Sequence, residues 1–538
     1  MKKLIAVLAA TALCIFSGFA QDADFDDFGS NDFGDFGSDD FGGSSDSGSG
    51  FSATKLEIGG EAQLDFRAYV DDTGTSGLPI DEWETKADPN GKINFKYAND
   101  SVFAEAKFGF SKDTIKNHPE DIIDELSLSA YLGNWELQAG KMKIVWGKGD
   151  KLHVIDNFNA NDYRDFLTPD YIDRRIAEPM IRAIYNVPKD VGPFTSSKFE
   201  FVWTPFMTAD RYASDGRWIP TQVRNLEKTL TKYGTDAIGE TVKNLEEART
   251  KLSAVTVAHE KETDESKKNQ YENKMNQLSE EISDLNALYL AQLNNSTSLA
   301  DNLYPDLYQL KYMQAGARFT TTTGSWDWGI SYYFGRDKRA SFDYAKMASY
   351  VPEYLQGTVK ESDKFIDYDF LQVFGIEAAK TIGAYNFRAE AAYNLTSDIA
   401  GDDPDVHNNS VAWVFGFDRD LPISELNINI QNQGKYVINH HKIEDSSDTE
   451  SGTYATDNKL VLNISDNLAH NKLKPEISAI YSFEHFDLII MPKITWYVAD
   501  GLELSARGFY MKNFVENRKE FGDWTENSFV QLGAKYTF

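Results

Sequence analysis

The residues best able to do chemistry are charged side chains between Gly140 and Arg182. Acidic and basic groups are closely mixed there. Charges of opposite sign that face each other across a narrow passage set a local field and a minimum diameter. The alternative is that the same charges brace the segment against its surroundings through salt bridges. The candidate lining residues are Lys148, Asp150, Lys151, Arg164, Asp165, Arg174, Arg175 and Arg182.

Catalytic and metal-binding arrangements are not indicated. Neither a Gly-x-Ser-x-Gly nor a His-Glu-x-x-His motif accompanies the histidines. The pair His440-His441 precedes an acidic stretch, but neighbouring strand residues point to opposite faces, so the pair is a poor chelate. The acids Asp402, Asp403 and Asp405 lack the glycine and terminal glutamate of an EF-hand loop. We therefore expect no enzyme activity, no cofactor and no metal site.

The elements that must position the charged segment are strands with alternating apolar and polar residues. From Lys55 to Val70 the alternation persists for longer than the about 9 to 11 residues that a tilted strand needs to cross a membrane. Two strand pairs flank the tight turns Asn99-Asp100 and Gly133-Asn134. Strands are expected at 55–70, 92–98, 102–110, 125–132, 135–144, 179–187, 197–204, 309–321, 326–334, 367–380, 385–395, 410–418, 424–438, 458–466, 473–483, 487–498, 502–512 and 526–538.

These strands predict an all-β fold, a transmembrane antiparallel β-barrel of about 18 strands, with short turns on one rim and long loops on the other. The connection at Glu484-His485 is unusually short for the long-loop rim, which leaves about 16 strands as an alternative. Aromatic residues on the lipid-facing parity mark the two rims. They are Trp326, Trp328, Tyr332, Phe334, Trp413, Phe415, Phe417, Trp496 and Tyr510.

The N-terminal residues have the pattern of a secretory signal at 1–20, with a basic start, an apolar run and small residues before Gln21. A lipoprotein signal ending at Cys14 is disfavoured by Leu13. Because Cys14 is the only cysteine, the mature chain would carry no thiol. The following residues, 21–50, repeat Asp-Phe-Gly among Ser and Gly and predict a disordered, periplasmic tail, either a spacer or a set of Phe anchors for a partner.

The formal charge of −30 argues against nucleic acid as a partner. The residues at the lumen-facing positions of the strands nevertheless predict an interior with charges of both signs and without strong anion selectivity. The basic residues on that parity are Arg67, Lys107, Arg182, Arg318, Arg388, Lys493, Arg507 and Lys535. The acidic ones are Glu57, Glu61, Asp65, Glu105, Asp327, Glu390 and Glu503. The surplus negative charge therefore belongs to the tail and the loops.

A different pattern occupies residues 206–305. Tyr271, Met275, Leu278 and Ile282 begin a four-three spacing, and a weaker version of it surrounds Ile238. This spacing predicts a helical hairpin with arms of roughly 45 Å, extracellular by the strand count. Glycines in the first arm suggest that it is two helices. Three roles are open for the hairpin. It binds a surface or a partner, it shields the lumen, or its two helices simply pack against each other and need no partner.

The last strand ends on Phe538 after alternating apolar residues, and it resembles the terminal strand of bacterial outer-membrane barrels. That resemblance implies recognition of Phe538 by the barrel-assembly machinery. Trp146-Gly147, the acids that follow and Pro169-Asp170 resemble a segment of a large family of Gram-negative outer-membrane barrels catalogued as a domain of unknown function, and more loosely other substrate-selective porins. The resemblance spans 140–182 and implies no particular solute.

We therefore expect a 51–538 barrel in the cell outer membrane. The first hypothesis is a porin-like channel for passive diffusion of small hydrophilic solutes, with the 146–178 loop constricting the lumen. The alternative is a surface-exposed adhesin or structural barrel that acts through the helical hairpin or the acidic tail. The expected partners are outer-membrane lipid, the assembly machinery and small solutes. Association into a homo-oligomer is left open.

Overall fold

The computed structural model describes residues 55–71, 79–150, 152–165, 171–214, 216–299, 302–360, 363–443, 448–515, 518 and 522–538. The expected signal at 1–20, the expected tail at 21–50 and Lys151 lie outside these residues.

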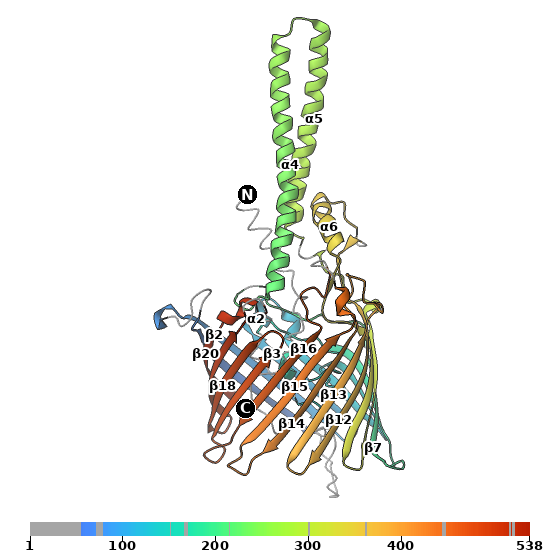
Figure 1. Cartoon of the computed structure of the whole chain (residues 1–538), viewed down its shortest axis with the longest axis vertical. Helices are drawn as coiled ribbons and strands as arrows, with labels where there is room; N and C mark the ends of the chain where they lie inside the picture. Colours follow the sequence, from blue (N-terminus) through green and yellow to red (C-terminus); the bar gives the residue numbers. More distant parts are fainter. Residues whose placement is uncertain are drawn as a thin grey trace.

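Eighteen of the described strands form one closed antiparallel barrel, which confirms the expected fold (Figure 1). The strand β1 closes the barrel by pairing with β20, from Glu61 opposite Thr537 to Tyr69 opposite Phe529. The barrel strands are β1 (Lys55–Tyr69), β2 (Glu84–Ala98), β3 (Val102–Ser111), β4 (Ile123–Leu132), β5 (Trp135–Met142), β6 (Glu178–Asn186), β7 (Phe194–Thr204), β8 (Gln314–Thr323), β9 (Trp326–Arg336), β12 (Phe370–Ile382), β13 (Tyr385–Leu395), β14 (Ser410–Asp420), β15 (Asn427–Val437), β16 (Thr456–Ser465), β17 (Leu473–Ser482), β18 (Asp487–Ala499), β19 (Leu502–Asn513) and β20 (Phe529–Thr537).

Two details of the barrel differ from the sequence-based expectation. The alternative of 16 strands is wrong, because the connection from Ser482 to Asp487 is a genuine tight turn, in which the Phe486 amide donates to the Ser482 carbonyl at 2.9 Å. The strand β2 begins at Glu84 rather than at residue 92, because it pairs with β1 along its whole length. Its first half lacks clean alternation, so its own sequence could not reveal the pairing.

The outer surface of the barrel carries apolar side chains. Trp326, Phe415, Trp496 and Tyr510 are 48, 51, 51 and 47 % exposed. Large apolar side chains exposed in such numbers indicate an apolar surrounding, as around a transmembrane barrel with aromatic girdles. Among the described residues, no helix is both long enough and apolar enough to span a membrane.

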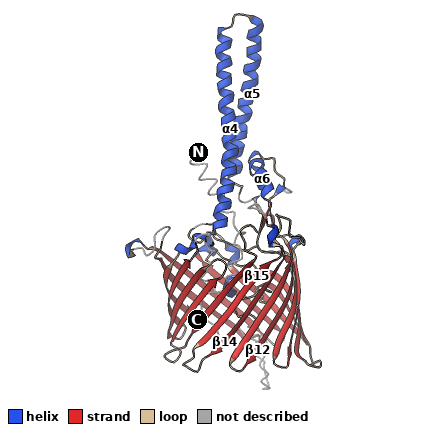
Figure 2. Cartoon of the chain, viewed as in Figure 1, coloured by secondary structure: helices blue, strands red, loops and turns tan. Residues whose placement is uncertain are grey.

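The helical insert rises from the rim that carries the long loops (Figure 2). It consists of α4 (Thr221–Lys261) and α5 (Glu265–Ser296), 41 and 32 residues long. The longer arm therefore extends about 60 Å, further than expected. The expectation of two helices in the first arm is wrong, because α4 runs through Gly234 and Gly239 without a break. Packing along the hairpin outweighs the cost of about 1 kcal/mol for each glycine.

The base of the hairpin is a packed unit above the barrel. Val223, Leu226 and Ile238 of α4 join Tyr350 and Leu355 of α6 (Tyr344–Gln356) in one buried apolar cluster. A two-stranded sheet, β10 (Ser341–Phe342) with β11 (Ile366–Asp367), completes this unit. The hairpin is thus fixed at its base rather than joined by a free linker. Short helices elsewhere are α2 (Lys112–Lys116), α3 (Tyr171–Arg174) and 3₁₀ turns at Ile80–Glu82, Pro119–Asp121, Leu310–Tyr312, His440–Lys442 and Gly522–Glu526.

Candidate functional site

The segment between β5 and β6 turns into the barrel, and hydrogen bonds of Asn159 hold its two ends together. The Asn159 side chain accepts from the Ile144 amide at 2.9 Å and donates to the carbonyls of Met142 at 3.0 Å and Ile176 at 2.9 Å. Arg175 donates to the Asn159 carbonyl at 2.7 Å and pairs with Asp156. These contacts join the start and the end of the segment, so the described residues 143–150, 152–165 and 171–177 form a compact loop, here called the lumen loop.

Trp146 anchors the lumen loop to the wall made by β7 and β8. The Trp146 side chain is completely buried, and its indole N–H donates to Glu200 at 2.8 Å. The ring packs edge-on against Phe158, with centroids 5.1 Å apart. Gly316 makes room for both rings, because a Cβ there would lie 2.8 Å from each. The tryptophan thus fixes where the loop enters the lumen.

Glu390, on β13, holds the next turn of the lumen loop. Its carboxylate accepts from the amides of Gly149 at 2.6 Å and Val154 at 2.9 Å, and it contacts the His153 Nδ1 at 2.8 Å. Gly147 has φ of 130°, and a Cβ there would lie 2.2 Å from the same carboxylate. The turn therefore requires glycine and closes tightly around one acidic side chain.

Asp150 extends this contact to β15. Its carboxylate accepts from Asn429, its carbonyl accepts from Gln431 at 2.7 Å, and Arg388 lies 3.6 Å from the carboxylate. Lys148, in the same turn, is half-buried.

The far end of the lumen loop reaches the opposite wall. Arg67, on β1, donates to both oxygens of Asp165 at 3.2 Å. Arg164 pairs with Asp162 and, at 2.5 Å, with Asp113 of α2. Burial acts to raise the pKa of Asp162, but the hydrogen bonds and charge of Arg164 outweigh it and keep that pKa below its ordinary value.

Two of the predicted residues lie in packed surroundings, and a third lies on the barrel wall. Arg174 is 1 % exposed, with its guanidinium 5.6 Å from the Tyr163 ring centroid, and Arg175 is 3 % exposed. Arg182 lies on the wall, where it donates to Glu200 at 2.7 Å and to Gln138 at 3.2 Å. The structure thus brings Asp150, Asp165 and Arg182 into the barrel at separate walls, while Arg174 and Arg175 brace the loop itself.

A second segment in the barrel mouth escaped the sequence analysis. Residues 205–214 and 216–220, after β7, cross toward β1 and β19. Trp218 donates to the Tyr69 hydroxyl at 2.9 Å and packs against Phe509, with ring centroids 5.7 Å apart. Asp210 accepts from the Asn161 amide at 2.7 Å and so joins this segment to the lumen loop. The apolar cluster around Trp218 contains Tyr69, Leu152, Tyr163, Tyr212, Ala213, Val414, Val461, Ile480, Ile489, Met491, Phe509, Met511, Trp524 and Phe529.

This apolar cluster could have been suspected from the sequence. Met491 and Phe509 share lumen-facing parity with charged neighbours on their strands, and an interior filled with water would not favour apolar side chains there. Met142 at the end of β5 and Ile144 in the lumen loop also face inward, and they belong to the buried apolar cluster that contains Trp146 and Phe158.

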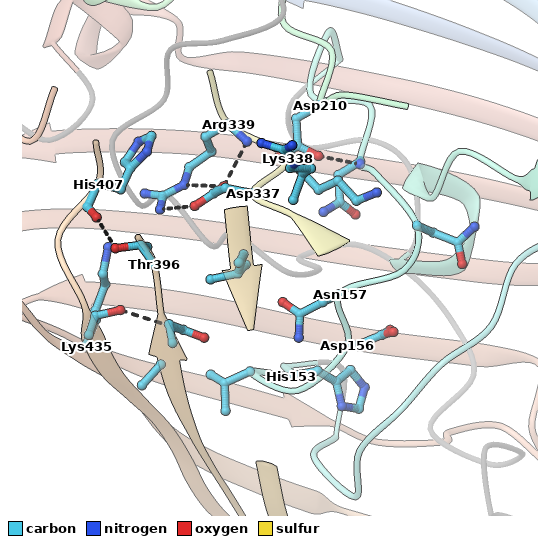
Figure 3. Close-up of a pocket in the computed structure, with 18 of the residues that line it drawn as sticks. His153, Asp156, Asn157, Asp210, Asp337, Lys338, Arg339, Thr396, His407 and Lys435 are labelled. Carbon is cyan, nitrogen blue, oxygen red and sulfur yellow. Dashed lines mark hydrogen bonds and ion pairs between the residues drawn. The ribbon is translucent and has the colours of Figure 1, made fainter. Parts of the chain in front are cut away.

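A polar cavity of about 140 Å³ lies between the lumen loop and the wall from β12 to β15 (Figure 3). Groups of both signs line it, with Asp337 and Arg339 paired at 2.7 Å. Burial would raise the pKa of Asp337, but Arg339 and His407 hold it far below its ordinary value. Burial and Arg339 act to lower the pKa of His407, whereas its hydrogen bond to Asp369 prevails and raises it. The volume suits several waters or one small polar solute.

Several solved structures are similar to the chain over most of its length. It is 9 % identical to OccK3 (OpdO) of Pseudomonas aeruginosa, with 90 % of this chain and 96 % of that chain covered and a TM-score of 0.40. It is 9 % identical to the outer-membrane channel DcaP of Acinetobacter baumannii, with coverage of 91 and 99 % and a TM-score of 0.36. For a mutant of the Rh. blastica porin the identity is 8 %, the coverage is 90 and 100 %, and the TM-score is 0.34.

No curated protein matches the chain. A family model described as a protein of unknown function, DUF1302, matches residues 32–491, which include most of the barrel, the lumen loop and the helical insert. The chain therefore belongs to the DUF1302 family.

Proposed function

We propose that this protein is a porin-like outer-membrane channel for passive diffusion of small hydrophilic solutes, with residues 146–178 constricting its lumen. The observation that carries this proposal is a loop enclosed by a closed barrel and bound to opposite walls. Glu390 on β13 holds one turn of the loop, and Arg67 on β1 holds Asp165. Charged groups held across a constriction set a local field and a minimum diameter, which is how pores select solutes.

The location follows from the outer surface and the two rims. An outward apolar face with exposed aromatic side chains suits the outer membrane. We place the rim with long loops and the helical hairpin outside the cell, and the tail at 21–50 in the periplasm. Phe538 is 60 % exposed, while its backbone amide and carbonyl bond Gly60 at 2.9 and 3.0 Å. An exposed terminal aromatic beside the closing strands supports recognition by the barrel-assembly machinery.

Liposome swelling with uncharged solutes of increasing size tests the channel. The mature protein is compared with a variant in which residues 148–175 are replaced by a short Gly-Ser linker. We expect the native protein to admit only the smallest solutes and the variant to admit larger ones. Heat-modifiable migration shows whether each protein is folded. A folded native protein with no permeation in liposomes, together with a folded variant that is equally closed, would overturn the proposal.

One observation favours the second candidate, a surface-exposed adhesin or structural barrel closed to solutes. The apolar cluster around Trp218 packs two loops into the barrel mouth. If neither the native protein nor the linker variant admits solutes, the helical hairpin, which is packed at its base, becomes the functional part. Its binding to a surface would then be measured with the full chain and with a variant that has shortened arms.

A further inference from the structure

Two asparagines of the lumen loop line the polar cavity with amide atoms that the chain does not satisfy. The Asn157 Nδ2 and the Asn161 Oδ1 are buried and have no hydrogen-bond partner among the residues that the structure describes. Asn159 lies between them and uses its amide group in three hydrogen bonds within the loop. Because nearly all buried polar groups in proteins have a partner, the two atoms indicate a hydrogen-bonding guest in the cavity.

The residues beside these asparagines hold them at the cavity wall. Phe158 and Ala160 are both 0 % exposed, and the Phe158 ring packs edge-on against Tyr333, with centroids 5.1 Å apart. The backbone of 157–161 is therefore fixed by packing on its other side. The terminal torsion of an asparagine side chain is broad, so a small rotation turns either amide toward a guest.

The barrel wall supplies complementary groups to the same cavity. Figure 3 shows Asn157 on the side of the lumen loop and Thr396 on the side of the wall. The Ser410 hydroxyl accepts from the Asn394 Nδ2 at 3.1 Å, which leaves its own proton for another acceptor. The Asn408 Nδ2 donates to the Ile438 carbonyl at 3.1 Å, which leaves its amide oxygen for another donor. Donors and acceptors thus lie on both sides, as a guest rich in hydroxyl groups requires.

The charged groups of the lining already have partners inside the protein. Asp337 pairs with Arg339 at 2.7 Å, and Asp156 pairs with Arg175. Other charged or titratable lining residues contact groups beside the cavity: Lys338 with Glu178 at 3.4 Å, Lys435 with Glu450 at 3.9 Å, His153 with Glu390 at 2.8 Å, His407 with Asp369 at 2.5 Å, and Arg336 with the carbonyls of Tyr368 at 3.0 Å and Lys311 at 3.4 Å. A charged guest would have to compete with these contacts, so the lining favours an uncharged one.

We propose that the polar cavity is a binding site for small uncharged polyols. A cavity of about 150 Å³ is large enough for benzene, so a volume of about 140 Å³ admits a guest of about six to eight non-hydrogen atoms. The site rests on the proposed channel function only for its role in solute passage, since the binding itself requires no conduction.

The test uses the full mature protein and three probes with backbones of four carbons. Erythritol has four hydroxyl groups, butane-1,4-diol has two, and γ-aminobutyrate carries two charges. The double variant Asn157→Leu with Asn161→Leu replaces each amide by an apolar group of similar shape, and the single variant Asn157→Leu serves if the double variant does not fold. The control Asn94→Leu makes the same change on β2, where the Asn94 Oδ1 is also buried without a partner among the described residues and does not line the cavity.

Binding is measured by saturation-transfer NMR on folded protein in detergent, and passage is measured by liposome swelling. We expect saturable erythritol binding to the native protein and to the Asn94→Leu control with similar affinity. The double variant should bind erythritol about tenfold more weakly, because hydrogen bonds to the guest are lost. All three proteins should keep the same heat-modifiable migration, because the replaced amide atoms have no partner in the described chain.

Several results would overturn the site. They are a native protein without saturable erythritol binding, equal affinities in the native protein and the double variant, an equal loss in the control, or tighter binding of butane-1,4-diol or γ-aminobutyrate than of erythritol. Erythritol binding without any passage in liposomes would support the site and overturn the channel. Passage of erythritol without saturable binding would overturn the site and leave the channel in place.

Discussion

Replacing Glu390 should release the lumen loop. The carboxylate makes three contacts of 2.6, 2.8 and 2.9 Å with Gly149, His153 and Val154. Hydrogen bonds to a charged group contribute about 1.5 to 3 kcal/mol each, and loss of one partner of a buried pair costs about 3 to 5 kcal/mol. Even a loss of about 3 kcal/mol changes the ratio of released to bound loop by about 100-fold. Glu390→Ala should therefore shift the turn at 147–154 away from β13.

A spin label on Lys148→Cys reports this release, since Cys14 is the only natural cysteine in the chain and lies within the expected signal. We expect faster label motion in Glu390→Ala and a fluctuating, larger single-channel current. The matched control is Glu503→Ala, which removes another lumen-facing carboxylate, one whose ion pair with Lys535 lies on the barrel wall. Unchanged label motion in Glu390→Ala, or an equal change in the control, would refute the reasoning.

Three further predictions follow from the same structure. Trp146→Ala should destabilise the lumen loop by about 3 to 5 kcal/mol, measured as a lower midpoint in heat-modifiable migration; Trp326→Ala on the exposed outer face should leave it unchanged. His407 has a raised pKa, so the stabilisation from its pair with Asp369 is fully present below about pH 6.5, the unfolded value, and is lost as pH rises through the folded pKa. The protection factor for hydrogen exchange at 396–410, which is corrected for the intrinsic dependence of exchange on pH, should therefore be larger at acidic than at alkaline pH, and His407→Gln, which leaves Asp337 and Arg339 in place, should lose the difference. Replacement of residues 246–288 by a short linker keeps the apolar base of the hairpin and should leave current unchanged; a changed current would show that the distal arms act on the lumen.

The barrel could be predicted because the alternation of apolar and polar residues is visible within each strand by itself. Each strand alternates between lipid and lumen, so Leu64 and Phe66 are exposed outward while Asp65 and Arg67 are buried inward. Turns such as Gly133-Asn134 also show in the sequence, since Gly133 adopts φ of 63°. The complete pairing of β2 could not be seen in the same way, because β1 rather than local alternation fixes it.

The contacts of the lumen loop could not be predicted residue by residue. The sequence indicated that residues such as Asp150 and Asp165 form one charged segment, but their partners Asn429 and Arg67 lie far away in the chain. The same holds for Glu390, which strand parity placed in the lumen without showing what it binds. The segment at 205–220 was missed because it looks like a connection to the helices, and only the inward apolar residues of distant strands give it a packing surface.

The most direct measurement of the central claim is single-channel conductance of the refolded mature protein in a planar bilayer, beside the variant in which residues 148–175 become a Gly-Ser linker. We predict steady current in the native protein and a larger current in the variant, because the lumen loop no longer spans the barrel. Absence of current in both, from protein shown to be folded by β-sheet circular dichroism and heat-modifiable migration, would contradict the account.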